Sequence, residues 1–180
     1  ITTGFSILAF SYSGNIYGSE LLLSSIFGSA TALAAYGLGV AGILLILGLF
    51  TRATSYFLLV LYAYSFFVFG SYALTYTDFL GAFALTAILG GGMWSLDSLR
   101  HVRSTRLLRS IEPLAFPLLR ICFGWGVLWA SIYAKFIHSN LALEVVVQND
   151  LTRFFPFDPL FVVLGALIIE FLAGLMLIAG

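Results

Sequence analysis

Long apolar stretches are the feature of this sequence that most restricts its fold. Crossing the ~30 Å hydrocarbon core of a bilayer takes about 20 apolar residues in an α-helix. Five windows of the chain meet or approach that length, namely 32–50, 55–74, 79–94, 114–134 and 160–180. The sequence therefore predicts an all-α, polytopic transmembrane helix bundle. For residues 1–31 three alternatives stay open, because this part could span the membrane, re-enter it or lie at its interface.

The composition supports a membrane protein and excludes several other classes. Charged residues make up 9% of the chain and hydrophobic ones 61%, whereas soluble domains carry about 25% charged residues, so the chain has too few charges to cover a water-exposed surface. Eight basic and eight acidic residues balance each other, which argues against a nucleic-acid partner because binding the phosphate backbone needs a dense basic patch. The partners we expect are membrane lipids and other membrane protein subunits.

The few possible metal ligands do not fall into a recognised pattern. Cys122 is the only cysteine, so the chain has neither an internal disulfide nor a Cys-x-x-Cys motif. A metal site or proton relay formed by His138, Glu144 and Asp150 is an alternative, but its spacing fits no ligand motif. We expect no metal and no cofactor carried by the chain itself, with quinone as the one cofactor to consider.

A basic segment separates the third window from the fourth. Residues 96–113 carry four arginines at a strict spacing of three: Arg100, Arg103, Arg106 and Arg109. Short loops rich in arginine mark the cytoplasmic side and contact anionic headgroups, although a site for nucleic acid or a specific partner is an alternative. A cytoplasmic loop here puts Arg52 inside and both Asp78 and the segment 135–158 outside. The expected location is the inner (cytoplasmic) membrane of a bacterium or archaeon.

Two short segments indicate an internal repeat. Residues 41–48 read A-G-I-L-L-I-L-G and residues 173–180 read A-G-L-M-L-I-A-G, with five identities in eight positions at an offset of 132. Both end a helix that runs from outside to inside, as in parallel repeats. We expect two tandem membrane units, 1–95 and an incomplete 114–180, joined by the loop 96–113 in a chain truncated at both ends. Chance similarity between common membrane residues is the alternative.

Ionisable residues inside the membrane are functional candidates by default. Glu170 lies ~15 Å and Arg120 ~21 Å from the outer boundary, a difference that an arginine side chain can span, so a Glu170–Arg120 pair is allowed. Alternatively, Arg120 extends to the cytoplasmic headgroups while Glu170 stays protonated. Lys135, at the outer end of the helix that carries Arg120, is either an interfacial anchor or part of the same site. The candidate intramembrane polar site is therefore Arg120, Lys135 and Glu170.

The segment 141–157 on the outer side mixes apolar runs with polar residues. This pattern is typical of a short amphipathic helix that lies on the outer leaflet and caps the bundle. A lid over a site for a lipid-soluble molecule is the more specific interpretation, and the sequence leaves both open.

Several of these positions together resemble the DoxX-like superfamily of integral membrane proteins (DoxX/DoxD/MauE-type). The shared pattern is an arginine early in one helix (Arg120), a Lys-Phe pair at its far end (Lys135-Phe136) and a glutamate in the next (Glu170) before Gly-Leu-x-Leu-x-x-Gly (174–180). In the first half, residues 48–52 are similar to the Gly-Leu-x-Thr-Arg turn that follows that stretch.

This resemblance covers 32–95 and, more closely, 114–180. It implies four-helix units, two of them in tandem here, and a membrane subunit associated with redox systems that are linked to quinone in some members. By similarity, Arg120, Lys135 and Glu170 map onto the family's polar positions.

Three functions remain open at this level. The first is an integral membrane subunit of a redox or respiratory-type complex that contributes a quinone-binding pocket. The second is a structural or assembly subunit that packs its helices in a larger membrane complex. The third is a small proton-coupled transporter in which Glu170 carries the proton. Whether the chain is an enzyme stays open as well.

Overall fold

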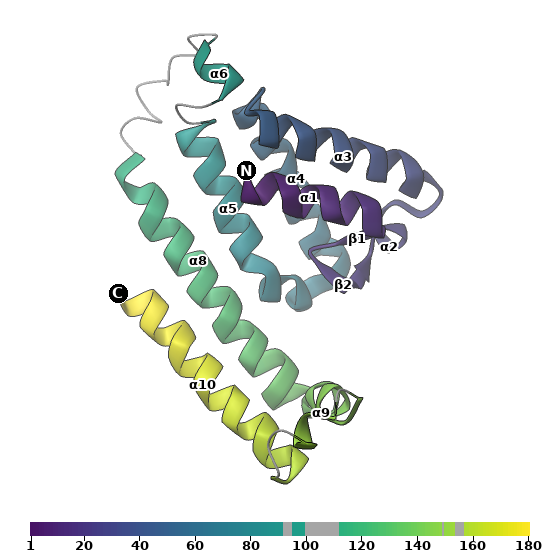
Figure 1. Cartoon of the computed structure of the whole chain (residues 1–180), viewed down its shortest axis with the longest axis vertical. Helices are drawn as coiled ribbons and strands as arrows, with labels where there is room; N and C mark the ends of the chain where they lie inside the picture. The colour runs from purple at the N-terminus through teal and green to yellow at the C-terminus, as the bar shows by residue number, and fades with distance from the viewer. Residues whose placement is uncertain (92–94, 100–111, 149, 154–156) are drawn as a thin grey trace.

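A computed structural model describes the chain except for residues 92–94, 100–111, 149 and 154–156 (Figure 1). In this described part, four helical stretches are long and apolar enough to cross a membrane: Leu23–Leu47, Thr51–Leu89, Glu112–Ile137 and Pro159–Ala179. The prediction of a helical membrane protein is confirmed at this level. The arginines Arg100, Arg103, Arg106 and Arg109 of the predicted basic loop lie outside the described residues.

The N-terminal region is a helix followed by a small hairpin. Helix α1 (Thr2–Ser13) ends at Gly14, whose φ of 71° is a left-handed conformation that glycine adopts without strain. Strands β1 (Asn15–Ile16) and β2 (Gly18–Leu22) pair antiparallel. Residues 1–31 thus fold as a short helix and a hairpin, followed by α2 (Leu23–Phe27) and η1 (Gly28–Ala30).

Helix α3 (Thr31–Leu47) packs against α1 at a contact between two glycines. A Cβ on Gly4 would lie 2.9 Å from the carbonyl oxygen of Gly42, and a Cβ on Gly42 would lie 3.0 Å from that of Gly4. Leu8 and Ile46 pack against the same two glycines. Small residues at a helix crossing let the backbones approach closely, which is a common way to pack membrane helices.

The second apolar stretch contains two helices and the turn between them. It consists of α4 (Thr51–Phe69), η2 (Gly70–Tyr76) and α5 (Thr77–Leu89), and α5 returns alongside α4 (Figure 1). The predicted separate span 79–94 is wrong in its length, because α5 has 13 residues, about 20 Å at 1.5 Å per residue, and ends at Leu89. Alone it is shorter than the hydrocarbon core.

A short helix fastens the N-terminus of α4. In α6 (Leu96–Leu99), the Asp97 carboxylate accepts hydrogen bonds from the backbone N–H groups of Phe50 (2.9 Å) and Thr51 (2.8 Å). The first N–H groups of a helix have no partner within the helix, and a carboxylate there also interacts favourably with the helix dipole. The start of the segment predicted as a loop therefore caps α4.

The C-terminal half is a pair of antiparallel helices joined by a third. Its elements are η3 (Glu112–Leu114), α8 (Ala115–Ala130), the π-helical η4 (Ser131–Ile137), α9 (Ser139–Gln148), η5 (Leu151–Arg153) and α10 (Pro159–Ala179). Asp158 starts α10, since its Oδ1 accepts a hydrogen bond of 2.8 Å from the N–H of Leu160, and Pro159 occupies the first helical turn.

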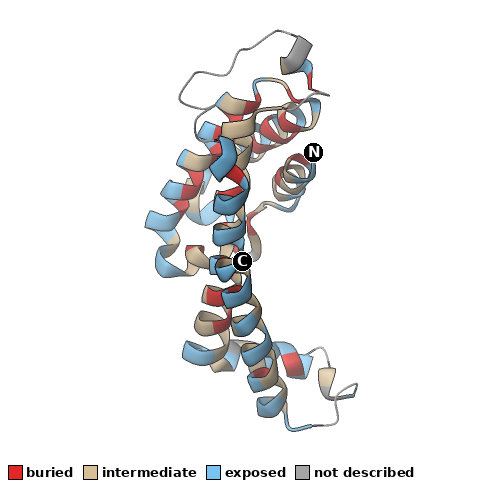
Figure 2. Ribbon diagram, turned by 90° about the vertical axis from the view of Figure 1, so that its left-hand side faces the viewer, coloured by how far each residue is buried: buried red, intermediate tan, exposed pale blue. Residues whose placement is uncertain are grey.

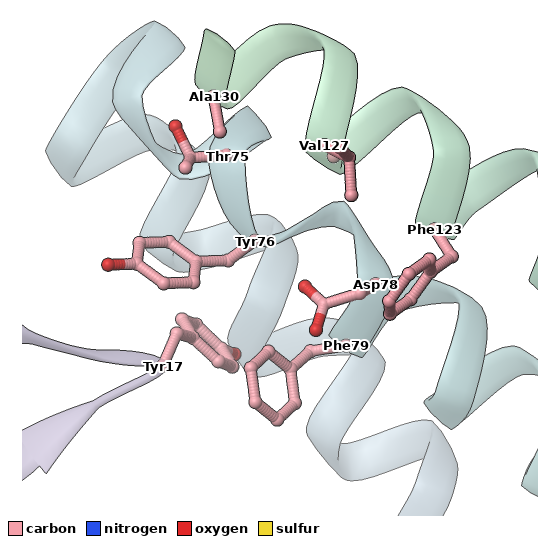
Figure 3. Close-up of a pocket in the computed structure, with 9 residues that line it drawn as sticks. Tyr17, Thr75, Tyr76, Asp78, Phe79, Phe123, Val127 and Ala130 are labelled. Carbon is pink, nitrogen blue, oxygen red and sulfur yellow. The ribbon is translucent and has the colours of Figure 1, made fainter. Parts of the chain in front are cut away.

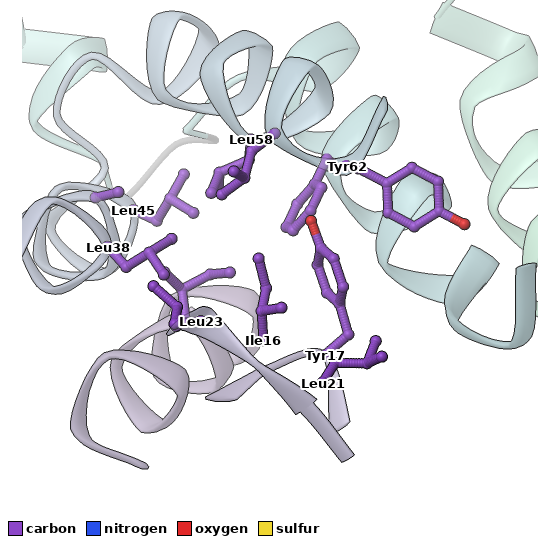
Figure 4. Packing of buried hydrophobic residues seen from close by; sticks show 12 residues of the cluster. Ile16, Tyr17, Leu21, Leu23, Leu38, Leu45, Leu58 and Tyr62 are labelled. Atoms are coloured by element: carbon purple, nitrogen blue, oxygen red, sulfur yellow. The ribbon is translucent and has the colours of Figure 1, made fainter. Parts of the chain in front are cut away.

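Helices α8 and α10 cross at a glycine pair of the same kind, Gly124 with Gly174, and Leu128 and Ile178 pack against it. The buried hydrophobic core lies elsewhere, between α1, the hairpin, α3, α4 and α5 (Figure 4). By contrast, the outer faces of α8 and α10 are largely exposed and apolar (Figure 2). Because the most apolar window, with a mean hydropathy of 2.6, belongs to α10, these faces suit contact with lipid.

Candidate functional site

Two charged side chains meet between α8 and α10. The Nζ of Lys135, in η4, donates a hydrogen bond to Oε2 of Glu170, in α10, and the two form an ion pair. The Lys135 side chain is 18% exposed and that of Glu170 40%. A charge in an apolar surrounding is costly unless it is paired, so each of these two residues stabilises the charge of the other.

The π-helical turn places Lys135 toward α10. At its start, the buried Ser131 donates a hydrogen bond of 2.7 Å to the carbonyl oxygen of Leu128, and at its end the N–H of His138 bonds the carbonyl oxygen of Tyr133 at 3.0 Å. A π-turn holds more residues than an α-turn and therefore rotates the side chains that follow it. Such turns occur often at functional sites.

The ion pair lies on the wall of a cavity of about 630 Å³ between η2, η4, α9 and α10. Its lining residues are mainly alanine and valine: Tyr72, Ala134, Lys135, Ala142, Glu144, Val145, Val146, Gln148, Leu151, Val162, Val163, Ala166 and Glu170. Pockets for small ligands usually measure about 300–1,000 Å³ and combine apolar walls with a few polar groups. This cavity has that size and that lining.

Helix α9 forms one wall of the cavity. Val146 is buried, and Gln148 donates a hydrogen bond of 2.9 Å to Glu144, both of them exposed residues that also line the cavity. A short helix was predicted for the segment 141–157, and α9 covers only its first part, since it runs from Ser139 to Gln148. It packs against α10 beside the ion pair, which is the position that a lid over the site would occupy.

Arg120 does not reach Glu170, so the pairing considered from the sequence is wrong. A Cβ on Gly180 would lie 3.2 Å from Nη1 of Arg120, and Gly180 is ten residues after Glu170, about 15 Å along the helix. The reason is the crossing at Gly124 and Gly174. Arg120 lies on one side of that crossing, whereas Glu170 and Lys135 both lie on the other.

Distances along the helices explain why Lys135 replaces Arg120. Leu128 contacts Gly174, and from this contact Lys135 is seven residues along α8 and η4, while Glu170 is four residues back along α10. At 1.5 Å per residue the two differ in depth by about 4 Å, which a lysine side chain spans.

Asp78 is a half-buried carboxylate that the sequence did not single out as a candidate site residue. It lies in the first turn of α5, where its backbone nitrogen is 3.5 Å from a Cβ placed on Gly126. Gly126 is eleven residues from both Ala115 and Ile137, and hence midway along α8 and η4. The available signal was that Asp78 falls within the apolar stretch Thr51–Leu89, between its two helical windows.

The described residues show no cluster of three or more His, Cys, Asp or Glu side chains that could hold a metal ion. The alternative site of His138, Glu144 and Asp150 is therefore not assembled. The His138 ring instead lies 4.7 Å from the ring of Tyr133.

Comparisons of the chain with models of known protein families, with curated proteins and with solved structures found no match. What the site can do therefore follows from its own chemistry. A largely apolar cavity with a lysine–glutamate ion pair on its wall can hold the polar head of a molecule whose remainder is apolar.

Proposed function

We propose that this chain is an integral membrane protein that binds a lipid-soluble molecule at Lys135 and Glu170, and that this molecule is a quinone. In this proposal the chain is a subunit of a redox or respiratory-type membrane complex. The observation that carries the proposal is the Lys135–Glu170 ion pair on the wall of an otherwise largely apolar cavity of about 630 Å³.

A quinone matches the chemistry of these two residues. Its carbonyl oxygens accept hydrogen bonds, which the Lys135 ammonium can donate, and the hydroxyls of the reduced form can donate to the Glu170 carboxylate. Electrons for its reduction come from a partner subunit in this proposal. Glu170, 40% exposed, supplies or accepts the proton.

The apolar tail of the ligand has a route out of the cavity. Val162, Val163 and Ala166 of α10 line one side, and the neighbouring Ile169 and Leu172 on the same helix are exposed toward the lipid. A tail leaving past α10 remains in an apolar environment, so its burial costs no desolvation of polar groups.

The two glycine crossings support a tandem duplication. Gly4 and Leu8 in α1 correspond to Gly124 and Leu128 in α8 at an offset of 120, and Gly42 and Ile46 in α3 correspond to Gly174 and Ile178 in α10 at the predicted offset of 132. The same residue types make the same contacts in both pairs. We propose that both derive from one repeated unit, of the DoxX-like kind that the motifs resemble.

If the units are copies, only the second carries the polar site. The positions that correspond to Lys135 and Glu170 are Asn15 and Leu38, and Leu38 is part of the buried core. The twelve additional residues of the second copy, the difference between its two offsets, fall between the paired helices, where α9 lines the cavity. The ion pair and its lid thus occur together.

For the orientation we propose the inner (cytoplasmic) membrane, with the loop 96–113 in the cytoplasm. Support comes from the four arginines of that loop and the positive-inside rule.

Quinone binding to the protein in phosphatidylcholine nanodiscs tests this function. A ubiquinone analogue with a decyl tail is titrated against the wild type and against Lys135→Met and Glu170→Gln. Because each variant removes a charged hydrogen-bonding group, we expect an affinity loss of about tenfold or more. The control is Glu112→Gln, which changes an exposed carboxylate in η3, at the other end of the helical stretch that carries Lys135, and keeps wild-type affinity. Equal affinity in all four proteins would overturn the proposal.

A further inference from the structure

A second cavity, of about 340 Å³, lies between the hairpin, η2, the start of α5 and α8 (Figure 3). It is lined by Tyr17, Thr75, Tyr76, Asp78, Phe79, Phe123, Gly126, Val127 and Ala130, and shares none of these residues with the cavity at Lys135. Its volume falls at the lower end of the range for small-molecule sites. It is therefore a separate site that suits a small ligand.

The carboxylate of Asp78 points into this space, between Tyr76, Phe79 and Val127 (Figure 3). Asp78 lies beside Gly126, near the middle of the helix formed by α8 and η4. Among the described residues the structure records no basic side chain paired with it. A carboxylate in an apolar surrounding requires a counter-charge or a proton, and a positively charged occupant of the cavity would supply the counter-charge.

Aromatic rings surround the carboxylate. The ring centroid of Tyr17 is 5.3 Å from that of Phe79 and 6.3 Å from that of Tyr76, and Phe123 lines the side formed by α8. The faces of aromatic rings attract cations, and several rings together with one anionic group bind alkylammonium ions well. An inorganic cation, by contrast, prefers a shell of oxygen ligands.

A buried hydroxyl group on the wall adds hydrogen-bonding capacity. The Thr75 Oγ1 has no hydrogen-bond partner among the described residues. A buried polar group without a partner costs free energy. A bound ammonium ion or the water it brings would supply partners for such groups.

We propose that this cavity binds a small organic ammonium cation, with Asp78 as its counter-ion and Tyr17, Tyr76 and Phe79 against its alkyl groups. Glycine at position 126 keeps the space open, because a Cβ there would lie 3.3 Å from the carbonyl oxygen of Thr75 and 3.5 Å from the nitrogen of Asp78. The site is independent of the proposed quinone cavity, and neither proposal requires the other.

Isothermal titration of tetramethylammonium chloride into the full chain in nanodiscs tests the proposal. The wild type gives saturable binding, and Asp78→Asn lowers the affinity about tenfold or more because the counter-charge is lost. Phe79→Leu removes one ring and lowers it about threefold to tenfold. Asp150→Asn is the matched control, since Asp150 is an exposed residue with a positive φ of 49° that asparagine tolerates, and it binds like the wild type.

Three outcomes would overturn the proposal. The first is the absence of saturable binding in the wild type, which would leave Asp78 as a proton site only. The second is equal binding by Asp78→Asn, and the third is displacement of tetramethylammonium by an equal concentration of sodium chloride, which would indicate an inorganic cation site. Gel filtration shows whether Asp78→Asn folds. If it does not fold, two other variants still decide the question, because Phe79→Leu keeps an apolar side chain at its position and Asp78→Glu keeps an ionisable one.

Discussion

Gly124 of α8 and Gly174 of α10 meet backbone to backbone, and a Cβ on either residue would lie 2.9 Å from the carbonyl oxygen of the other. This contact brings the two helices so close that polar side chains on the same side of the crossing can pair. It therefore decides that Lys135 meets Glu170.

Gly174→Ala is expected to push α8 and α10 apart. The added Cβ has backbone atoms of both Gly124 and Leu128 at 2.9 Å, and such overpacking costs about 1–3 kcal/mol. Thermal unfolding in nanodiscs measures the change. Gly165→Ala, on the same helix with nothing within 4 Å of its Cβ, is the control and should be neutral or stabilising by up to about 1 kcal/mol. Equal effects of the two variants would contradict the close contact.

The Lys135–Glu170 pair is expected to behave as a unit. Lys135→Met or Glu170→Gln alone leaves one partner without its counterpart and should destabilise by about 1–3 kcal/mol, less than for a fully buried pair because Glu170 is 40% exposed. The double variant should lose less than the sum of the two single losses. Unfolding of all four proteins forms a double-mutant cycle. Strict additivity would show that the two side chains do not interact.

Filling the larger cavity should block its ligand. Ala166 lines the cavity, so Ala166→Phe is expected to lower the affinity for the decyl ubiquinone analogue by about tenfold or more while the ion pair remains. Met176→Phe is the control, since Met176 is 74% exposed on the same helix and does not line the cavity. A similar loss in the control would point to a general effect of bulk on α10.

Asp97 is expected to stabilise α4 from a distance in sequence. Asp97→Ala removes the acceptor for the N–H groups of Phe50 and Thr51, and the loss of such a cap costs about 0.5–2 kcal/mol. Asp97→Asn keeps one of the two oxygens that accept these hydrogen bonds and should retain part of the stability, because an asparagine oxygen also caps helices. Unfolding of the three proteins by denaturant tests this, and equal losses in both variants would assign the effect to charge alone.

Ionisation of the Tyr17 phenol at high pH should lower the stability of the protein. Burial raises the pKa of Tyr17, which lies in the hairpin before the first apolar stretch, above the usual value of about 10. The folded state thus keeps the phenol proton longer than the unfolded chain. This contribution is fully present below about pH 10 and is lost as the pH rises toward the folded pKa.

The absorbance of tyrosinate follows this titration directly. Tyr17→Phe should make the stability above about pH 10 less dependent on pH, whereas Tyr12→Phe should not, because Tyr12 is 96% exposed. A wild-type stability that stays flat to strongly alkaline pH would contradict a buried, protonated Tyr17.

The sequence by itself determined the membrane-type helices, a short helix in the segment 141–157 that the structure places at Ser139–Gln148, and the residues worth attention, Lys135 and Glu170. Those features depend on local properties, namely the length of an apolar run, its amphipathic pattern and the rarity of charge within it. It also indicated the offset of 132 that relates Gly42 to Gly174.

Only the tertiary structure decided which polar residues meet. Depths counted along straight helices allowed Arg120 to reach Glu170, but the crossing at Gly174 and the π-turn before Lys135 put the lysine there instead. Asp78 lies beside the middle of α8 because the start of α5 packs there. A pairing between helices depends on where two backbones touch, and no single segment of the sequence contains that information.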